Sequence, residues 1–499
     1  MNLLVIAVFL YPLILLGISL WRSRDVKDHD DFMVAGRNVP VAMLVGTLVC
    51  TWIGSGSLFG GAGLDYRTGV AELWFSSGAW VGLVIAYFIA ARVRRIAEYT
   101  VPDLLEKRYN AAARVLGTIA IVLAYVTIAA YQFRGGGWIL SIVTDGAISP
   151  EVGMYITAAT IVLFTAAAGM MAIVTVDIFN GVIITLGVLF ALPYMVFQFG
   201  GVGAVIDALP PQHLTVLGGH QPLWVLGVAL PTFLLLLGES GIYQKFFSAK
   251  DANAARKAVI GMVIGVVLLE TALALLAIVG RAYYPDLIGA TSVVGRAATE
   301  TIILYIARHG LPMLGGAILL AAAVAIVLST GNSFLLIPST NVARDIYQRF
   351  INPDAREGQM LLVQRATIVA FGVFALGLIT QFDSVLAMAL YAYSLVGASL
   401  TPALLAAFLW KRVTPAGGVA CIVGGMGTIL VLGVLSRVGI DFSWGEFDFA
   451  SSDYIVIPGV LASLSLLVGV SLLTPASPKE KWAPFFEASA EAVADGDQG

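Results

Sequence analysis

Thirteen apolar segments, each long enough to cross a lipid bilayer as a helix, dominate this chain of 499 residues. A spanning helix needs about 20 mainly apolar residues, because lipid cannot hydrogen-bond to the backbone. The chain is 59% hydrophobic and only 12% charged, with a mean hydropathy of +0.91, values that soluble domains do not show. We predict an all-α polytopic membrane protein with about thirteen transmembrane helices, at residues 2–21, 41–64, 70–91, 112–143, 152–169, 171–199, 222–241, 258–280, 312–338, 364–380, 383–410, 418–440 and 454–474.

Basic residues are concentrated in alternate loops between these segments. With the N-terminus outside, 22 of the 28 Lys and Arg residues lie on the cytoplasmic side, as the positive-inside rule requires. We interpret residues 2–21 as a retained first helix and not a signal peptide, because no basic residue precedes it. The expected location is the cell (plasma) membrane, with the N-terminus outside and the C-terminus in the cytoplasm.

The spans at about 41–199 and about 222–410 form two groups of five. Because five is odd, the second group enters the membrane from the opposite face, which is the geometry of an inverted repeat. The first helix of each group is interrupted, by GSGSLFGGAG at 54–63 and by Pro231 followed by GESG at 238–241. Paired interruptions indicate a central binding site; tight packing through small residues is the alternative.

We expect residues 1–474 to form one transmembrane transport domain, in which helices 2–21, 418–440 and 454–474 flank the two repeats. Residues 475–499 are mostly acidic and small, which predicts a flexible cytoplasmic tail.

Two adjacent hydroxyls, Ser329 and Thr330, follow an apolar run in the predicted span 312–338. On a helix they point about 100° apart and can face one neighbouring helix. A monovalent cation needs about five or six oxygens, which two hydroxyls and the carbonyls of an interrupted helix would largely supply. Hydroxyls that bond only to their own helix backbone are the alternative.

Three of the charged residues within the predicted helices are candidates for a functional role. Asp177 is a candidate for cation or proton binding, or alternatively a helix cap at the interface. Arg134 lies about nine residues inside its span, where it would bind a carboxylate or form an ion pair between helices. Glu239 lies in the second interruption, facing either the binding site or a cytoplasmic lysine.

Motifs of several enzyme classes are missing from the sequence. It contains no G-x-x-x-x-G-K-[ST], no G-x-S-x-G and no H-E-x-x-H, and its four histidines are scattered. We therefore expect no enzymatic activity, no use of ATP and no nucleic-acid partner. Transport driven by an ion gradient is the class of function that remains once these are excluded.

Several spaced stretches resemble the sodium/solute symporter family. They include FMVAGRNVP after the first span, GGAGLDYRTG in the second, EYTVPDLLEKRYN after the third, YQKFFSAKDANAAR after the seventh and LSTGNSFLLIPSTNVARDIYQRF around the ninth. The resemblance covers about residues 31–474. It implies a LeuT-like fold, a five-plus-five inverted repeat with discontinuous first and sixth core helices, and Na⁺ as the coupled ion.

The resemblance also assigns a sodium site. It places ligand carbonyls at Cys50, Ile53 and Ile326, and ligand hydroxyls at Ser329 and Thr330. Two more residues, Asp177 and Ser333, match positions that support sodium coupling or a second sodium site in the family. The local sequence VDIFN departs from the family's usual TD followed by a Gln three residues after the Asp. We therefore expect the hydrogen-bond network around Asp177 to differ from that of other members.

The resemblance assigns substrate contacts as well. Trp52 in TWIGSGS resembles the tryptophan of choline transporters, but Gly241 and Ile242 stand where an aromatic cage for choline would need a further ring. Gly241 also replaces the tyrosine gate of sugar transporters, so the resemblance favours neither choline nor a sugar as the solute. Sialic-acid members place an arginine on the core helix that holds Arg134. The expected substrate-binding residues are Trp52, Ser57, Ser76, Arg134, Glu239 and Tyr393.

The sequence therefore predicts a sodium-coupled symporter that imports a small organic solute by alternating access. The solute is expected to bear a carboxylate and to be amino-acid-like, a monocarboxylate or an acidic sugar. The alternatives are a proton-coupled importer of a neutral solute such as a sugar, and a solute sensor or channel on the same fold that does not transport.

Overall fold

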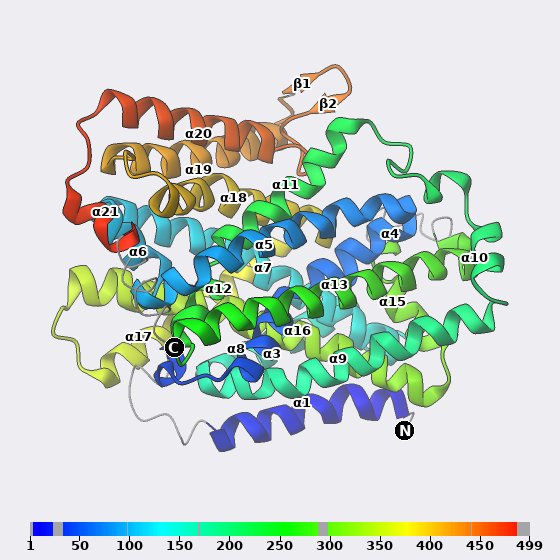
Figure 1. Cartoon of the computed structure of the whole chain (residues 1–499). Helices are drawn as coiled ribbons and strands as arrows, with labels where there is room; N and C mark the ends of the chain where they lie inside the picture. Colours follow the sequence, from blue (N-terminus) through cyan, green and yellow to red (C-terminus); the bar gives the residue numbers. More distant parts are fainter. Residues whose placement is uncertain are drawn as a thin grey trace, which may run out of the picture.

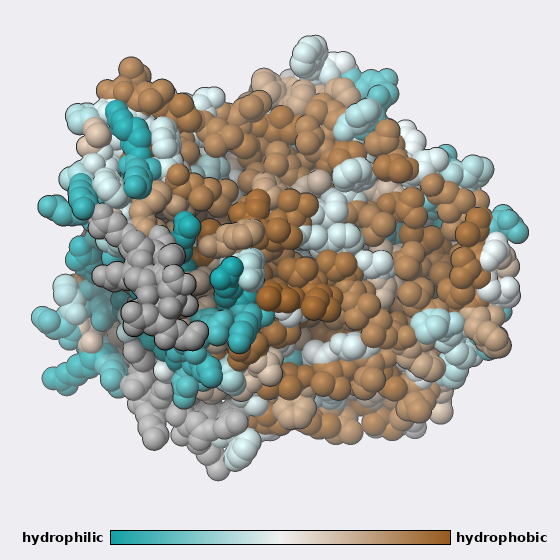
Figure 2. Space-filling model, viewed as in Figure 1, coloured by the Kyte–Doolittle hydropathy of each residue, from teal (hydrophilic) through white to brown (hydrophobic). Residues whose placement is uncertain are grey.

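The computed structural model describes residues 3–22, 33–96, 98–167, 170–287, 298–440 and 442–486. Its helices lie side by side in one bundle, with α1 at one edge and α19 and α20 at the other (Figure 1). Apolar side chains cover much of the visible face, and hydrophilic ones gather at its left end, where α6 and α21 lie (Figure 2). This is the surface expected of a protein whose middle lies in lipid.

The ten predicted core spans are helical. The first repeat consists of α3 (Val41–Trp52) continued by the π-helical turn η3 (Gly56–Gly61) and α4 (Ala62–Thr68), then α5 (Leu73–Ile96), α7 (Ala111–Val143), α8 (Pro150–Ala167) and α9 (Met170–Gln198). The second consists of α11 (Pro222–Gly238) with α12 (Ser240–Ser248), α13 (Ala252–Tyr283), α16 (Met313–Asn341), α17 (Glu357–Ile379) and α18 (Val385–Leu409).

The contacts between these helices repeat in the same order. The first helix of each group packs on the fifth of its own group, α3 on α9 and α11 on α18. The second helix of each group packs on the first of the other, α5 on α11 and α13 on α3. This reciprocal packing agrees with the predicted inverted repeat and brings the two interrupted helices into the centre.

Three further long helices flank the core. Helix α1 (Leu3–Arg22) packs on α9 and α16, whereas α19 (Pro415–Arg437) and α20 (Val456–Leu473) pack on each other and on α18. Short elements complete the described part: η2 (Ala35–Arg37), η4 (Gly69–Glu72), α6 (Val101–Arg108), α10 (Val202–Ala208), η5 (Pro211–Leu214), η6 (Pro285–Leu287), α15 (Ile302–Tyr305), η7 (Ile306–Gly310), η8 (Val342–Ile351), β1 (Ser443–Trp444), β2 (Phe447–Asp448) and α21 (Lys479–Phe486).

The number of spans agrees with the predicted thirteen once one helix is divided. Eleven helices in the described residues are long and apolar enough to cross a membrane, and two shorter apolar helices, Leu3–Ser19 and Val41–Trp52, accompany them. The second predicted span is split because α3 ends at Trp52, and its remaining residues belong to the helical stretch Gly56–Ile96, within which Gly69 has a positive φ of 67°.

The end of the chain differs from the expected flexible tail. Residues 479–486 form α21, in which Phe485 is buried against the ring of Phe408 at a centroid distance of 5.3 Å. Burial of this aromatic ring stabilises a helix that the acidic composition of the tail did not predict. Residues 487–499 lie outside the described residues.

A cluster of ion pairs joins α6 and α7 to η8 at one end of the bundle. Arg114 on α7 pairs with Asp103 and Glu106 on α6 and with Asp345 on η8, and Arg349 reaches Glu106 at 2.8 Å. Because Arg114 and Asp345 are buried, loss of either side chain would leave an uncompensated charge in the interior, so the elements that carry them are held in this arrangement.

Candidate functional site

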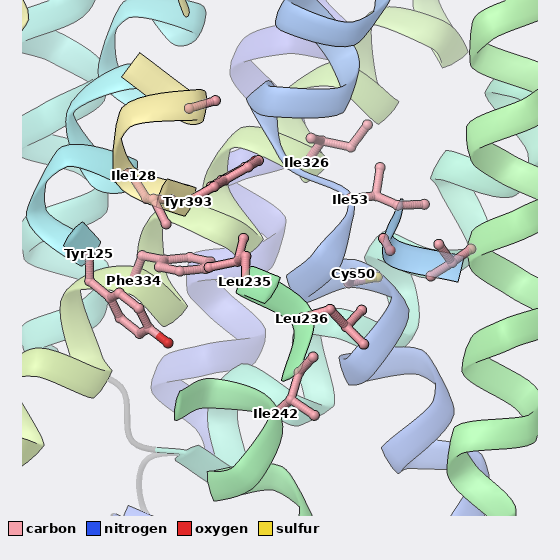
Figure 3. Close-up of a cluster of buried hydrophobic side chains, with 14 of the residues drawn as sticks. Cys50, Ile53, Tyr125, Ile128, Leu235, Leu236, Ile242, Ile326, Phe334 and Tyr393 are labelled. Atoms are coloured by element: carbon pink, nitrogen blue, oxygen red, sulfur yellow. The ribbon is translucent and has the colours of Figure 1, made fainter. Parts of the chain in front are cut away.

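Two helix interruptions meet in the middle of the molecule, the first at residues 53–54, where the predicted stretch 54–63 begins, and the second within the predicted stretch 238–241. Helix α3 ends at Trp52, and Ile53 takes an extended conformation (φ −75°, ψ 98°); Glu239 does the same (φ −72°, ψ 107°) between α11 and α12. The first interruption is shorter than the glycine run 54–63, because helical turns resume at residue 55. Figure 3 shows Cys50 and Ile53 at the first interruption and Leu236 and Ile242 on either side of the second.

The first interruption turns two backbone carbonyls toward α16. The hydroxyl of Thr330 lies 3.4 Å from the carbonyl oxygen of Cys50 and 3.3 Å from that of Ile53, and the hydroxyl of Ser329 lies 3.5 Å from Cys50 O. Four neutral oxygens from two helices therefore gather at one point. Ile326, buried on α16 one turn before Thr330, remains a predicted ligand.

The spacing of these oxygens fits a small hard cation better than a set of strong hydrogen bonds. Hydroxyl–carbonyl hydrogen bonds usually measure about 2.7–2.8 Å, shorter than the separations here. Around a cation with oxygen ligands at about 2.4 Å, neighbouring ligands of an octahedron lie about 3.4 Å apart. These oxygens could therefore hold a small hard cation, and their assignment to sodium stays a prediction.

Asp177 lies beside this cluster, buried on α9. Its carboxylate accepts hydrogen bonds from Ser329 Oγ at 2.5 Å and from Thr47 Oγ1 at 2.6 Å. The same Ser329 hydroxyl lies near Cys50 O, so Asp177 orients a predicted sodium ligand and places a negative charge behind it. Contacts with α3 and α16 place this acid inside the site and not at an interfacial helix cap.

Lys245, on α12, adds a buried positive charge. Its ammonium group donates to Thr51 Oγ1 and, at 3.1 Å, to the carbonyl of Thr47. Ser333 Oγ, assigned to sodium coupling or a second sodium site, lies 3.4 Å from Thr51 Oγ1. Lys245 thus occupies the neighbourhood in which a second cation was expected.

A small closed chamber lies between the two interruptions. Its volume is about 10 Å³, enough for about one water molecule. A solute can therefore enter only after the surrounding helices separate. The chamber is lined by Thr51, Trp52, Gly54, Tyr131, Leu235, Glu239, Thr330, Phe334 and Tyr393.

Aromatic side chains form much of this lining. The hydroxyls of Tyr131 and Tyr393 lie 3.2 Å apart, and Phe334 packs on Tyr125 with ring centroids 4.7 Å apart (Figure 3). The expectation of an incomplete aromatic cage, based on Gly241 and Ile242, did not anticipate rings from α7 and α16. Two predicted aromatic substrate contacts, Trp52 and Tyr393, line the chamber together, and the predicted contact Glu239 lines it as well.

Glu239 lines the chamber and also caps α12. Its carboxylate accepts the amide N–H groups of Gly241 and Ile242, each at 2.9 Å, and the hydroxyl of Tyr125 at 2.9 Å. These donors at the positive end of a helix stabilise a buried carboxylate. The hydrogen bonds of Lys245 go to Thr47 and Thr51 instead, and part of the role of Glu239 is structural.

The two predicted serine contacts face buried carboxyl groups instead of the chamber. Ser76 Oγ lies 3.4 Å from Glu72, and Ser57 Oγ donates to Glu270 at 3.2 Å. Glu270 also accepts the indole N–H groups of Trp52 at 2.9 Å and Trp80 at 2.8 Å. We did not select Glu270 from the sequence, although a lone acid in the apolar stretch VVLLETALALL was a usable signal.

Arg134 differs from the predicted role in substrate binding. One of its guanidinium nitrogens, Nη2, donates to the carbonyl of Ile379 at 2.6 Å and of Phe382 at 2.8 Å, at the C-terminal end of α17. Arg134 is not among the residues that line the chamber. The last carbonyls of a helix lack backbone donors and carry partial negative charge, so they pair with an arginine at this depth.

The sequence and the fold both match known transporters. The model of the sodium:solute symporter family matches residues 32–425. The osmoregulated proline transporter OpuE of Bacillus subtilis (strain 168) is 24% identical over 97% of each chain. The sodium/pantothenate symporter of Escherichia coli (strain K12) is 26% identical and is aligned over 92% of this chain and 94% of its own.

Solved structures share the same arrangement of helices. A Na⁺-coupled sialic acid symporter in a substrate-bound outward-open state superposes with a TM-score of 0.78 at 14% identity, covering 96% of this chain and 99% of that one. MhsT in complex with L-phenylalanine superposes with a TM-score of 0.53 at 14% identity, covering 86% and 98%. These likenesses confirm the LeuT-like fold, and with the family match over most of its length the chain belongs to the sodium:solute symporter family.

Proposed function

We propose that this sodium-coupled symporter imports a small amino-acid-like solute that bears a carboxylate. Family membership makes sodium the coupling ion and the protein a multi-pass membrane transporter. Because its curated relatives are transporters, we propose transport and not catalysis as its activity.

The position of Thr330 carries this proposal. Its hydroxyl belongs to the oxygen cluster of Cys50 and Ile53, and the same residue lines the chamber. A bound sodium ion would have Asp177 behind Ser329 on one side and the chamber on the Thr330 side, so the part of its charge that Asp177 does not offset would act on the solute. A carboxylate is the group that this charge would attract.

The relatives support the same class of solute. Their names specify proline and pantothenate, both of which are carboxylates. Among the three solute classes predicted from the sequence, an amino-acid-like solute agrees best with the chamber, because Glu239 and several aromatic rings line it. An arginine that would favour a purely anionic solute is not among the lining residues.

The proposed coupling follows from the elements that sodium would join. A cation held by carbonyls of α3 and hydroxyls of α16 stabilises one arrangement of these helices over others. If that arrangement is the outward-open one, sodium raises the affinity for the solute, and by linkage the solute raises the affinity for sodium. Residues 1–474 are proposed to act as one transport unit in this cycle.

Uptake into proteoliposomes tests this function. We expect an inward sodium gradient to drive accumulation of proline or a similar amino acid, and an inward proton gradient without sodium to drive none. Accumulation that follows the proton gradient alone would support proton coupling. Binding of a solute without accumulation would support the sensor or channel alternative.

The orientation of the chain is also a proposal, with the N-terminus outside. A thiol reagent that cannot cross membranes should label a cysteine introduced at Ser451 from outside, and one at Ala252 only from the cytoplasm. Both native cysteines, Cys50 and Cys421, are buried and should not react. The reverse labelling pattern would overturn the orientation.

A further inference from the structure

Glu270 is a buried carboxyl group that sodium binding does not explain. It lies on α13 with 4% of its surface exposed, and three donors surround it. Trp52 and Ser57 donate to one oxygen at 2.9 and 3.2 Å, and Trp80 donates to the other at 2.8 Å. An indole N–H can only donate, so the carboxyl oxygens of Glu270 accept from both tryptophans.

The surroundings of Glu270 hold little positive charge. In the part of the chain that the structure describes, its hydrogen-bond partners are the two indoles and one hydroxyl, all neutral. A carboxylate inside a membrane protein without a basic partner is costly. The three hydrogen bonds offset part of this cost, and a cation bound close by would offset more.

Trp52 connects this carboxylate to the chamber. Its indole N–H bonds to Glu270, and Trp52 also belongs to the chamber lining together with Tyr393. A hydrogen bond from the N–H to a carboxylate polarises the indole toward greater electron density on its ring. Such a ring attracts a cation more strongly.

We propose that Glu270 positions and polarises Trp52, so that the chamber selects solutes that carry an ammonium or quaternary ammonium group beside their carboxylate. This inference rests on the proposed import of an amino-acid-like solute and names the residues that would recognise its ammonium group. Sodium attracts the carboxylate of the solute from one side of the chamber, and the Trp52 ring attracts its ammonium group. Glu270 is a positioning residue, because it acts through Trp52.

The experiment compares solutes that differ only in the charged nitrogen. Proline is paired with cyclopentanecarboxylate, and glycine betaine with 3,3-dimethylbutanoate, in which carbon replaces nitrogen. Affinities are measured by competition with a radiolabelled solute on the purified full-length protein in saturating sodium. For the wild type we expect the nitrogen-containing member of the better-bound pair to bind about 5- to 30-fold more tightly.

Four single variants and one double variant separate the contributions of Glu270 and Trp52 to this preference. Glu270→Gln and Trp52→Phe should each reduce this preference severalfold, and the double variant should reduce it no further, since both remove the same interaction. Glu270→Asp should restore part of it. Trp80→Phe removes a donor to Glu270 outside the chamber lining, so it is the matched control and should retain most of the preference.

A second measurement separates this role from a structural one. The half-saturating sodium concentration for binding of sodium in the absence of solute should stay unchanged in Glu270→Gln, whereas general damage to the fold would weaken sodium and solute binding together. Trp52→Phe keeps an aromatic ring but cannot donate to Glu270, so it tests the inference even if Glu270→Gln does not fold.

Two results would overturn the inference by itself: sodium-driven uptake with equal affinity for both members of a pair, or a Trp52→Phe variant that keeps the full preference. Binding of neither pair, without sodium-driven uptake of any amino acid, would instead refute the proposed function and the inference with it.

Discussion

Replacement of Thr330 by valine tests the sodium site most directly. Valine has nearly the same shape, so the packing of this buried position is retained while the hydroxyl is lost. The hydroxyl lies 3.3 and 3.4 Å from two carbonyl oxygens, distances at which the hydrogen bonds themselves contribute little to folding. The main loss is therefore one oxygen ligand of the ion.

The size of the effect follows from the loss of one neutral oxygen that interacts with a charge. Such an interaction contributes about 1.5–3 kcal/mol. Each 1.4 kcal/mol changes an equilibrium constant about tenfold, so sodium affinity should fall roughly 10- to 150-fold. Solute affinity measured at saturating sodium should change much less, because the carboxylate senses the ion and not the hydroxyl.

The assay is the initial rate of solute uptake by proteoliposomes as a function of sodium concentration. Thr127→Val is the matched control, because the Thr127 hydroxyl donates at 2.8 Å to Leu123 O in its own helix. Its half-saturating sodium concentration should equal that of the wild type. A folded Thr330→Val protein with unchanged sodium dependence would refute the assignment of the site, and an equal shift in both variants would show a nonspecific effect.

Three further predictions follow from single residues. Arg134→Gln should lower the thermal unfolding temperature, since it removes two charged hydrogen bonds worth about 1.5–3 kcal/mol each, with no change in solute preference; a changed preference would return Arg134 to the binding site. Gly56→Ala should block uptake while sodium still binds, because a Cβ atom there would lie 2.4 Å from the Tyr393 hydroxyl and prevent the chamber from closing. Uptake by this variant at the wild-type rate would contradict the prediction. The hydrogen bond from Arg349 lowers the pKa of Glu106 below its ordinary value of 4.5. The ionised Glu106 therefore stabilises the folded protein above pH 4.5, and this stabilisation is lost as the pH falls through the lowered pKa. Glu106→Gln should therefore be less stable than the wild type near neutral pH and lose less stability on acidification, as followed by thermal unfolding against pH.

The sequence predicted those features that depend on local composition. Apolar length located the spans, and the basic loops gave an expected orientation, because lipid and surface charge act on each segment separately. The glycine runs and Glu239 located the helix interruptions, because backbone geometry is also local. Even so, the cap that Glu239 forms on α12 was not anticipated.

Only the tertiary structure decided which polar group meets which partner. Glu270 is more than 180 residues from each of its three donors in sequence, and helical periodicity in a uniformly apolar span does not reveal which face points inward. Arg134 lay at a depth that required a partner, but whether that partner was a solute or the end of α17 depended on how two helices pack. In a membrane, apolar faces can pack on lipid or on protein at similar cost, so hydrophobicity fixes the helices and their polar and small residues fix the arrangement.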